Sequence, residues 1–160
     1  MRWSSVVRQC RFDCVRVDLF GLSNMLFMLL FPVLSCVAAL VLTVTGAPGQ
    51  VAVSVYGGVC GMAAVMSWMS ALSVNVAEES GGHRAMNGMI PIARTSQVAG
   101  RFLFLLVTCA MWTVDVMACS VFFAFGDMMD SGWAGAMIPS AVIFAFSLIV
   151  GSILMAFSYR

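Results

Sequence analysis

The chain has 160 residues, of which 62% are hydrophobic and only 9% are charged. A soluble domain has about 25% charged residues and about 45–50% apolar ones, so this composition excludes an ordinary soluble protein. The formal net charge of +1 says little by itself. We expect most of the protein surface to contact the lipid bilayer, and we expect no nucleic-acid partner.

Four long apolar runs predict four transmembrane helices. A spanning helix needs about 20 mostly apolar residues, because the hydrocarbon core is about 30 Å thick and each residue rises about 1.5 Å. The runs are continuous and do not alternate with a period of two, which argues against a β-barrel. The sequence therefore predicts an all-α integral membrane protein with one transmembrane domain over residues 1–160. We place the spans at Asn24–Thr45, Val51–Ala77, Phe102–Phe125 and Met137–Ser158.

Residues 1–23 precede the first span and mix arginines with apolar side chains such as Trp3 and Phe12. This pattern predicts an amphipathic helix that lies in the cytoplasmic membrane interface, with the arginines reaching toward lipid headgroups. A short helix in water would show the same pattern, so that alternative stays open.

The second span contains Gly57 and Gly61, four residues apart. Small residues at this spacing let helix backbones approach closely, and van der Waals contact then drives helix association in lipid. We expect these glycines to pack inside the bundle. The alternative is that they form the seam of a dimer.

The longest hydrophilic stretch, residues 78–101, connects the second and third spans. A simple connection needs about 2–8 residues, so this one is long. Residues 84–90 are predicted to form a short amphipathic helix, and exposed Met beside charges indicates a docking surface for a cytoplasmic partner. The alternative is that the apolar patch rests on the membrane or on the N-terminal helix. The residues assigned to this partner-binding loop are Glu79, Arg84, Met86, Met89, Pro91 and Arg94.

Asp115 is the only formal charge well inside a predicted span. Inserting a carboxylate at this depth costs about 2.5–3.5 kcal/mol, so Asp115 is expected to face protein or water and to have a partner. With Trp112 and Thr113 nearby, it is a candidate for a substrate path or a proton site. The alternatives are a protonated carboxyl hydrogen-bonded between helices, or a span that lies deeper than drawn.

The eight basic residues, all Arg, lie in alternate connections. The other two connections, residues 46–50 and 126–136, contain none. Basic residues near spans are retained on the cytoplasmic side, so both termini are expected in the cytoplasm of a multi-pass plasma-membrane protein. The basic residues are Arg2, Arg8, Arg11 and Arg16 before the first span, Arg84, Arg94 and Arg101 between the second and third, and Arg160 after the fourth.

Several kinds of chemistry are excluded by residue counts. A phosphate-binding P-loop needs Lys, and this chain has none. His83 is the only histidine, which excludes His-pair zinc sites and makes Ser/His/Asp catalysis implausible. None of the six cysteines lies in an outer connection, so free thiols are expected. We therefore expect no enzyme activity, no cofactor and no metal.

Two stretches carry a family resemblance. Glu79, Gly82, the run Ile90-Pro91-Ile92-Ala93-Arg94-Thr95 and the helix start at Gln97–Arg101 resemble type-2 permeases of ATP-binding-cassette (ABC) transporters. Val17-Asp18-Leu19, preceded by Arg16, is similar to the residues just before the first span of the same family. The resemblance covers about residues 12–126. Family members usually have six spans, so we expect a fragment, a truncated product or a short variant with the first four.

The resemblance implies the membrane subunit of an exporter, working as a homo- or heterodimer with another permease. A separate cytoplasmic ATPase subunit would dock on the loop, with Glu79, Arg84, Pro91 and Arg94 in or beside the coupling element. Two other functions remain open from the residues alone. One is a proton-coupled secondary carrier that uses Asp115, and the other is a membrane scaffold or immunity protein that only binds a partner.

Overall fold

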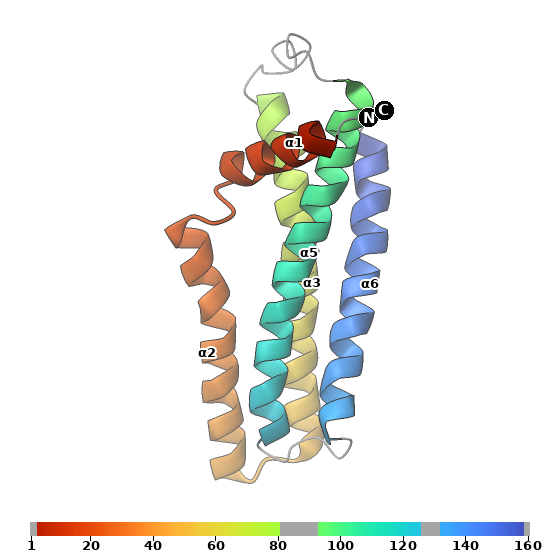
Figure 1. Ribbon diagram of the computed structural model, residues 1–160. Coiled ribbons are helices and arrows are strands. Elements are labelled where there is room, and N and C mark those ends of the chain that lie inside the picture. Colours follow the sequence, from red (N-terminus) through yellow and green to blue (C-terminus); the bar gives the residue numbers. More distant parts are fainter. Residues whose placement is uncertain (1–2, 81–92, 126–131, 159–160) are drawn as a thin grey trace.

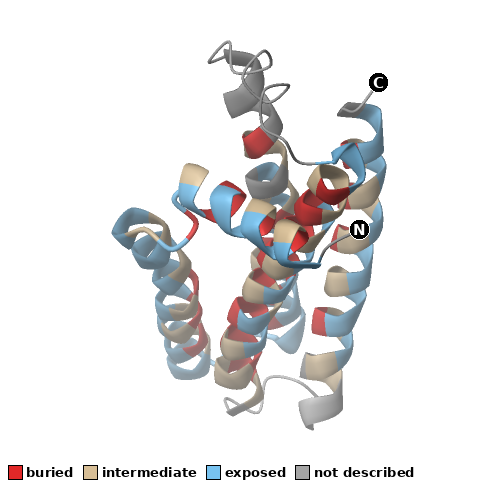
Figure 2. Cartoon of the chain, turned by 45° about the horizontal axis from the view of Figure 1, so that its top comes forward, coloured by how far each residue is buried: buried red, intermediate tan, exposed pale blue. Residues whose placement is uncertain are grey.

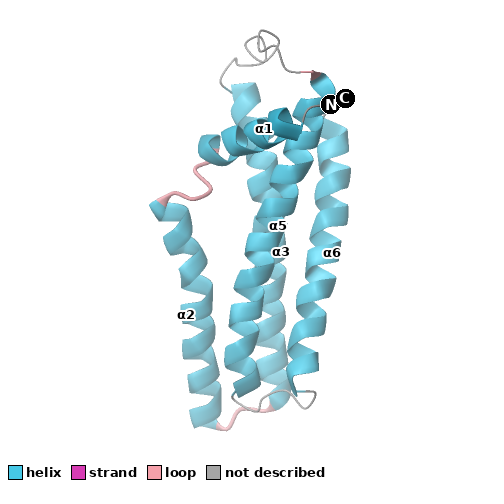
Figure 3. Cartoon of the chain, in the orientation of Figure 1, coloured by secondary structure: helices cyan, strands magenta, loops and turns pink. Residues whose placement is uncertain are grey.

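A computed structural model describes residues 3–80, 93–125 and 132–158, and these residues are almost entirely helical, with no strand among them. Figure 3 shows the helices and the short loops between them. The all-α fold is therefore confirmed. The helices, labelled as in Figure 1, are α1 (Trp3–Arg16), α2 (Leu22–Thr45), α3 (Gly49–Ser80), α5 (Arg94–Phe125) and α6 (Gly132–Ser158).

Four of these helices are long and apolar enough to cross a membrane, as the sequence predicts. The four run alternately up and down, so the ends of α3 and α6 and the start of α5 lie together beside α1 (Figure 1). We call this the α1 end and the opposite one the far end. Helix α5 begins at Arg94, well before the predicted start of its span at Phe102, because the polar turn that precedes the apolar run is also helical.

Helix α1 lies across the bundle instead of along it, and its buried face packs on α5 (Figure 1). It ends at Arg16, and Asp18 in the turn that follows has a left-handed backbone (φ 53°). The left-handed residue turns the chain back, so that the Leu19 amide donates to the Cys14 carbonyl at 2.9 Å. This bond satisfies one of the free carbonyls in the last turn of α1. This turn points Leu19 into the bundle, where it is almost completely buried.

A tight turn joins α2 to α3. Gly46 ends α2 with φ +60°, a conformation that glycine adopts without steric cost. The amide of Ala47 donates to the Leu42 carbonyl at 3.1 Å, and that of Gly46 to the Thr43 carbonyl at 3.3 Å. These bonds satisfy the last carbonyls of α2 and reverse the chain within a few residues, as the Gly/Pro sequence of this connection predicts.

The outer surface of the bundle is apolar, and much of its interior is polar. Figure 2 shows the exposed residues on the outward sides of the helices. On α6 the exposed apolar side chains recur every three or four residues and form one stripe: Ile138, Val142, Phe146, Ile149, Ile153 and Phe157. Buried polar side chains inside the spans are Ser35, Ser67, Thr108, Asp115, Ser120, Ser140 and Ser147. Lipid is the only solvent that suits this exterior.

Helix α5 is the centre of the bundle, since α1, α2, α3 and α6 all pack against it. Helix α2 packs mainly on α5 and much less on α3, and Figure 1 shows it standing to one side of the other spans. The apolar core has two parts. The part nearest α1 includes Leu19 and Phe104, and the part toward the far end includes Phe31 and Trp112.

Candidate functional site inside the bundle

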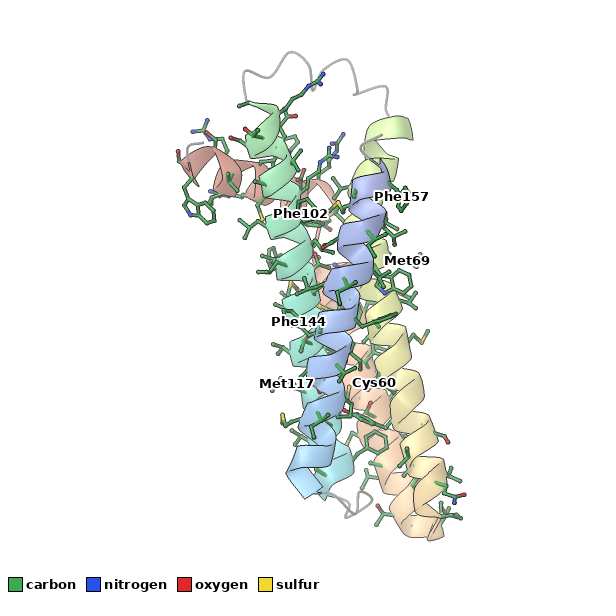
Figure 4. All side chains as sticks on the ribbon, turned by 90° about the vertical axis from the view of Figure 1, so that its right-hand side faces the viewer. Cys60, Met69, Phe102, Met117, Phe144 and Phe157 are labelled. Carbon is green, nitrogen blue, oxygen red and sulfur yellow. The ribbon has the colours of Figure 1, made fainter. Side chains whose placement is uncertain are left out.

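The candidate site is centred on Asp115, which lies on the inward face of α5. Trp112, Asp115, Val116 and Cys119 are all buried, and their spacing of three to four residues places them on one side of the helix. Asp115 faces protein, as predicted, because only 7% of its surface is exposed, but the predicted partner is not found for its Oδ2 among the described residues. Met117, on the same helix, points out of the bundle (Figure 4).

An aromatic cluster lies one helical turn from Asp115 toward the α1 end. The ring of Trp112 contacts Phe31 of α2 edge-on, with centroids 5.6 Å apart. Phe27, one turn earlier on α2, contacts Phe31 at 5.5 Å and Trp112 at 6.4 Å, again nearly perpendicular. Such edge-to-face contacts fix the register between α2 and α5, which brings the next turn of α2 level with Asp115.

Ser35 is on that next turn of α2 and is completely buried. Ser35 and Asp115 both lie within interaction range of the Cys119 thiol. In the described part of the chain, the Oγ of Ser35 and the Oδ2 of Asp115 have no hydrogen-bond partner. By contrast, Thr108 and Ser120 donate to carbonyls one turn back on α5, at 2.9 Å and 2.7 Å. Two buried polar groups near the same thiol therefore have an unsatisfied oxygen each, which is uncommon in folded proteins.

Polar side chains of the other two spans complete a layer at this level. Tyr56 of α3 is buried against Phe123, with ring centroids 5.5 Å apart. Its phenol group lies close to Ser120 of α5 and Ser140 of α6. Cys60 of α3, labelled in Figure 4, is also buried. All four spans thus contribute a hydroxyl, thiol or carboxyl group to the interior.

Not every residue predicted for the substrate path is in the site. Trp112 and Asp115 lie together on the face toward α2. Thr113 is only half-buried, and its hydroxyl donates to the Cys109 carbonyl of its own helix at 2.7 Å. That bond occupies the only donor of Thr113, so this side chain belongs to the α5 backbone and not to the site.

Gly57 and Gly61 do not pack against another helix of the described chain. Both are exposed, and a Cβ atom built on either one meets no atom within 4 Å. The inward face of α3 is formed instead by other residues, most of them small: Ala52, Tyr56, Cys60, Ala63, Ala64 and Ser67. The expectation that these glycines pack inside the bundle is therefore wrong, and the dimer seam stays a prediction.

The predicted partner-binding loop lies largely outside the described residues. This applies to Arg84, Met86, Met89 and Pro91. Glu79 is in the last turn of α3. Arg94 is the first residue of α5 and is exposed, so its guanidinium is accessible at the α1 end.

Gly100 is a functional candidate that sequence reasoning missed. It lies where α1 crosses α5, and a Cβ there would be 2.6 Å from the Gln9 Cβ and 3.1 Å from the Val6 carbonyl oxygen. The close approach is possible only because Gly100 has no side chain. It fixes α1 on the first turns of α5, beside the buried Arg101.

Buried polar and thiol groups lie in the same α1–α5 contact. Asp13 is fully buried and accepts a hydrogen bond from the Gln9 amide at 3.1 Å. Burial raises the pKa of the Cys10 thiol to about 12, and the adjacent Cys14 adds to the rise. Burial also raises the pKa of Cys14. Both thiols therefore stay protonated and unreactive at neutral pH.

The described residues contain no group of three or more His, Cys, Asp or Glu side chains arranged to hold a metal ion. All six cysteines are free thiols. What the interior offers chemically is one carboxyl group, several hydroxyls and an aromatic cluster. Such a set can bind or transfer a proton or a cation.

Comparison with known proteins does not place this chain in a family. No family model, no characterised protein and no solved structure matches this chain. Function must therefore be argued from the site and the fold.

Proposed function

We propose that this chain is the membrane-spanning permease subunit of an exporter that is driven by a separate cytoplasmic ATPase subunit. Three features support the proposal. The chain is a multi-pass bundle, it has the loop motif that resembles type-2 ABC permeases, and the buried Asp115 lies on the helix that begins within that motif.

The observation that carries the proposal is the continuity of α5. This helix has 32 residues, which makes it about 48 Å long. Its first two residues, Arg94 and Thr95, end the loop motif, Gly100 is in contact with α1, and Asp115 lies in the polar layer. Because a helix is stiff and every other described helix packs on this one, a force applied at Arg94 reaches the site without an intermediate hinge.

The orientation belongs to the same proposal. All described arginines are on α1 or on the first turns of α5, at the α1 end. We place this end in the cytoplasm and the protein in the plasma membrane, because loops with basic residues resist translocation. An ATPase subunit, which needs cytoplasmic ATP, would then find the loop on its own side.

A dimer with a second permease chain fits the exposed face of α3. Gly57 and Gly61 lie there with open space above them, which is the surface that close helix contact in lipid requires. The partner is a second copy or a related permease.

One observation favours a second candidate function, a proton-coupled carrier. The Oδ2 of Asp115 is buried without a hydrogen-bond partner in the described structure. A carboxyl group in that position changes protonation when water or cargo reaches it. Such a carrier would work without an ATPase.

Photocrosslinking from the start of α5 tests the proposed function. A photoactivatable amino acid replaces Thr95, which is exposed in the first turn, in cells of the source organism. The expected product is a protein with a Gly-x-x-x-x-Gly-Lys-Ser/Thr motif, and its yield should change when ATP and vanadate are added to opened membranes. The matched control is the same probe at Gln50, which is exposed at the far end.

Charge reversal adds a second comparison. Arg94→Glu should lower the yield of the ATPase product, whereas Arg8→Glu, also exposed at the α1 end, should leave it unchanged. The proposal is wrong if position 95 captures no P-loop protein, or if positions 95 and 50 capture the same one. A proton-coupled carrier would then be the better explanation of the Asp115 site.

A further inference from the structure

Asp115 has no countercharge on the described chain. The closest arginine along α5 is Arg101, fourteen residues earlier, and at about 1.5 Å per residue the two are about 21 Å apart. Every other described arginine is on α1 or at the start of α5. An ionised carboxylate at this depth needs a positive partner, so one must come from outside this part of the chain.

Two buried oxygen atoms near the Cys119 thiol, the shared neighbour of Asp115 and Ser35, also lack hydrogen-bond partners among the described residues. Asp115 Oδ2 and Ser35 Oγ are both buried, both lack partners in the described structure, and both lie near the Cys119 thiol. A group with two or more N–H donors would satisfy the carboxylate and the hydroxyl oxygen together. An ammonium group has such donors and supplies the missing charge.

The surroundings favour an organic cation over an inorganic one. A hard metal cation such as Ca²⁺ takes about 6–8 oxygen ligands, mostly carboxylates and carbonyls, whereas this layer has one carboxyl group and otherwise hydroxyls and soft thiols. One turn away are the rings of Phe31 and Trp112, with centroids 5.6 Å apart. Aromatic rings bind the apolar part of an amine and attract its charge.

We propose that Asp115 and Ser35 bind the nitrogen of a hydrophobic amine whose apolar part lies against Phe31 and Trp112. This inference rests on the proposed transport function only in naming the amine as the cargo. The access route is the seam between α2 and α5, because α2 packs on little else and can separate from α5 without breaking the contacts among α3, α5 and α6.

Binding is coupled to one proton. When the carboxyl group of Asp115 is protonated, its O–H bond breaks as the amine binds. The proton passes to water, and the carboxylate pairs with the ammonium group, so affinity rises with pH until Asp115 is fully ionised. The other titratable groups that face the site are Cys119 on α5 and Tyr56 and Cys60 on α3. Among the described residues, α2 and α6 place only the hydroxyls of Ser35 and Ser140 there.

Equilibrium dialysis with a matched pair of ligands tests the proposal. The full chain is reconstituted in lipid nanodiscs, and radiolabelled tryptamine is compared with tryptophol, which has the same indole and chain but a neutral hydroxyl. Tryptamine keeps its charge up to about pH 9, because alkylamines have pKa values near that of Lys, about 10.4. We expect saturable tryptamine binding that is at least about tenfold tighter than tryptophol binding and that strengthens as pH rises until Asp115 is fully ionised.

Substitutions at Asp115, Asp18 and Ser35 test which side chains bind the amine. Asp115→Asn should weaken tryptamine binding by about 30-fold or more, since it removes one member of a buried charge pair. Asp18→Asn makes the same change at an exposed acid outside the spans, where Asn also tolerates the left-handed backbone, and should bind like the parent. Ser35→Ala should weaken binding by about 3- to 10-fold through the loss of one hydrogen bond.

Each contrary result overturns the proposal. Equal binding of tryptamine and tryptophol would mean that only the indole is recognised. Parent-like binding to Asp115→Asn, or affinity that does not vary with pH, would show that Asp115 is not the counterion. If Asp115→Asn is not monodisperse, Ser35→Ala and the pH series on the parent protein decide the question. No ATPase is present, so failure here leaves the crosslinking result standing, and a failed crosslink leaves amine binding standing.

Discussion

Replacing Gly100 by Ala tests how α1 is held on the bundle. The new Cβ would lie 2.6 Å from Gln9 Cβ, 2.7 Å from Gln9 Cγ and 3.1 Å from the Val6 carbonyl oxygen. Ordinary carbon contacts are about 3.5–4.0 Å, so α1 must move by about 1 Å. The atoms in the way are backbone or close to it, and rotating a side chain cannot relieve the contact.

The magnitude follows from two opposing contributions. Overpacking costs about 1–3 kcal/mol, whereas Gly→Ala inside a helix gains about 0.5–1 kcal/mol. The difference is about 0–2.5 kcal/mol, and Gly100→Ala is expected to lower the free energy of unfolding by an amount in this range. Gly57→Ala is the matched control, because nothing lies within 4 Å of its new Cβ. That control should gain the full helix propensity of about 0.5–1 kcal/mol.

Two assays report the effect. Titration with SDS in mixed micelles, followed by tryptophan fluorescence, gives the unfolding free energies of both variants. Alkylation resolved by mass spectrometry gives the rate at Cys10 and Cys14, which are buried in the α1–α5 contact. Gly100→Ala should speed that alkylation, and Gly57→Ala should not. Equal unfolding free energies together with unchanged alkylation would refute the view that Gly100 sets the approach of α1.

Two further predictions concern the α1 end. Because burial raises the Cys10 pKa from 9.0 to about 12, the folded state holds this proton more tightly than the unfolded state. The stabilisation is complete below about pH 9 and is lost as pH rises toward about 12, so α1 should loosen in that range. Alkylation of Cys10 near pH 8 should be about a thousandfold slower than that of a free thiol, and a free-thiol rate would contradict its burial. In sealed intact cells, an impermeant maleimide should label Gln50→Cys but not Thr95→Cys, and the reverse pattern would place the α1 end outside.

The fold was predictable because its signal is local in sequence. Each span is a continuous apolar run, and the turn at Gly46 follows from residue types that end helices. The burial of Asp115 was predictable for the same reason, since a charge within such a run has to avoid lipid. These inferences need no knowledge of which helix lies beside which.

The rest of the site depends on helix faces, and the spans give little information about those. A soluble helix shows its buried side by hydrophobic periodicity, but a spanning helix is apolar all round. Gly57 and Gly100 are both glycines in long apolar helices. No atom lies within 4 Å of a Cβ built on Gly57, whereas Gly100 lies against α1. Ser35 was missed in the same way. A serine costs little in a span, and its importance comes from the register that Phe31 and Trp112 set between α2 and α5.

The position of α1 connects the two ends of the proposed mechanism. A turn of a few residues joins α1 to α2, and Gly100 fixes α1 on α5, so α1 links the two helices that carry Ser35 and Asp115. The remaining contact of α2 is mainly with α5 itself. A displacement of α1 relative to α5 must therefore pull on the seam that holds both unsatisfied polar groups. In the proposed mechanism, an ATPase docked beside Arg94 would act on α5 close to its contact with α1, and so on the helix that carries Asp115 and on the one that leads to Ser35.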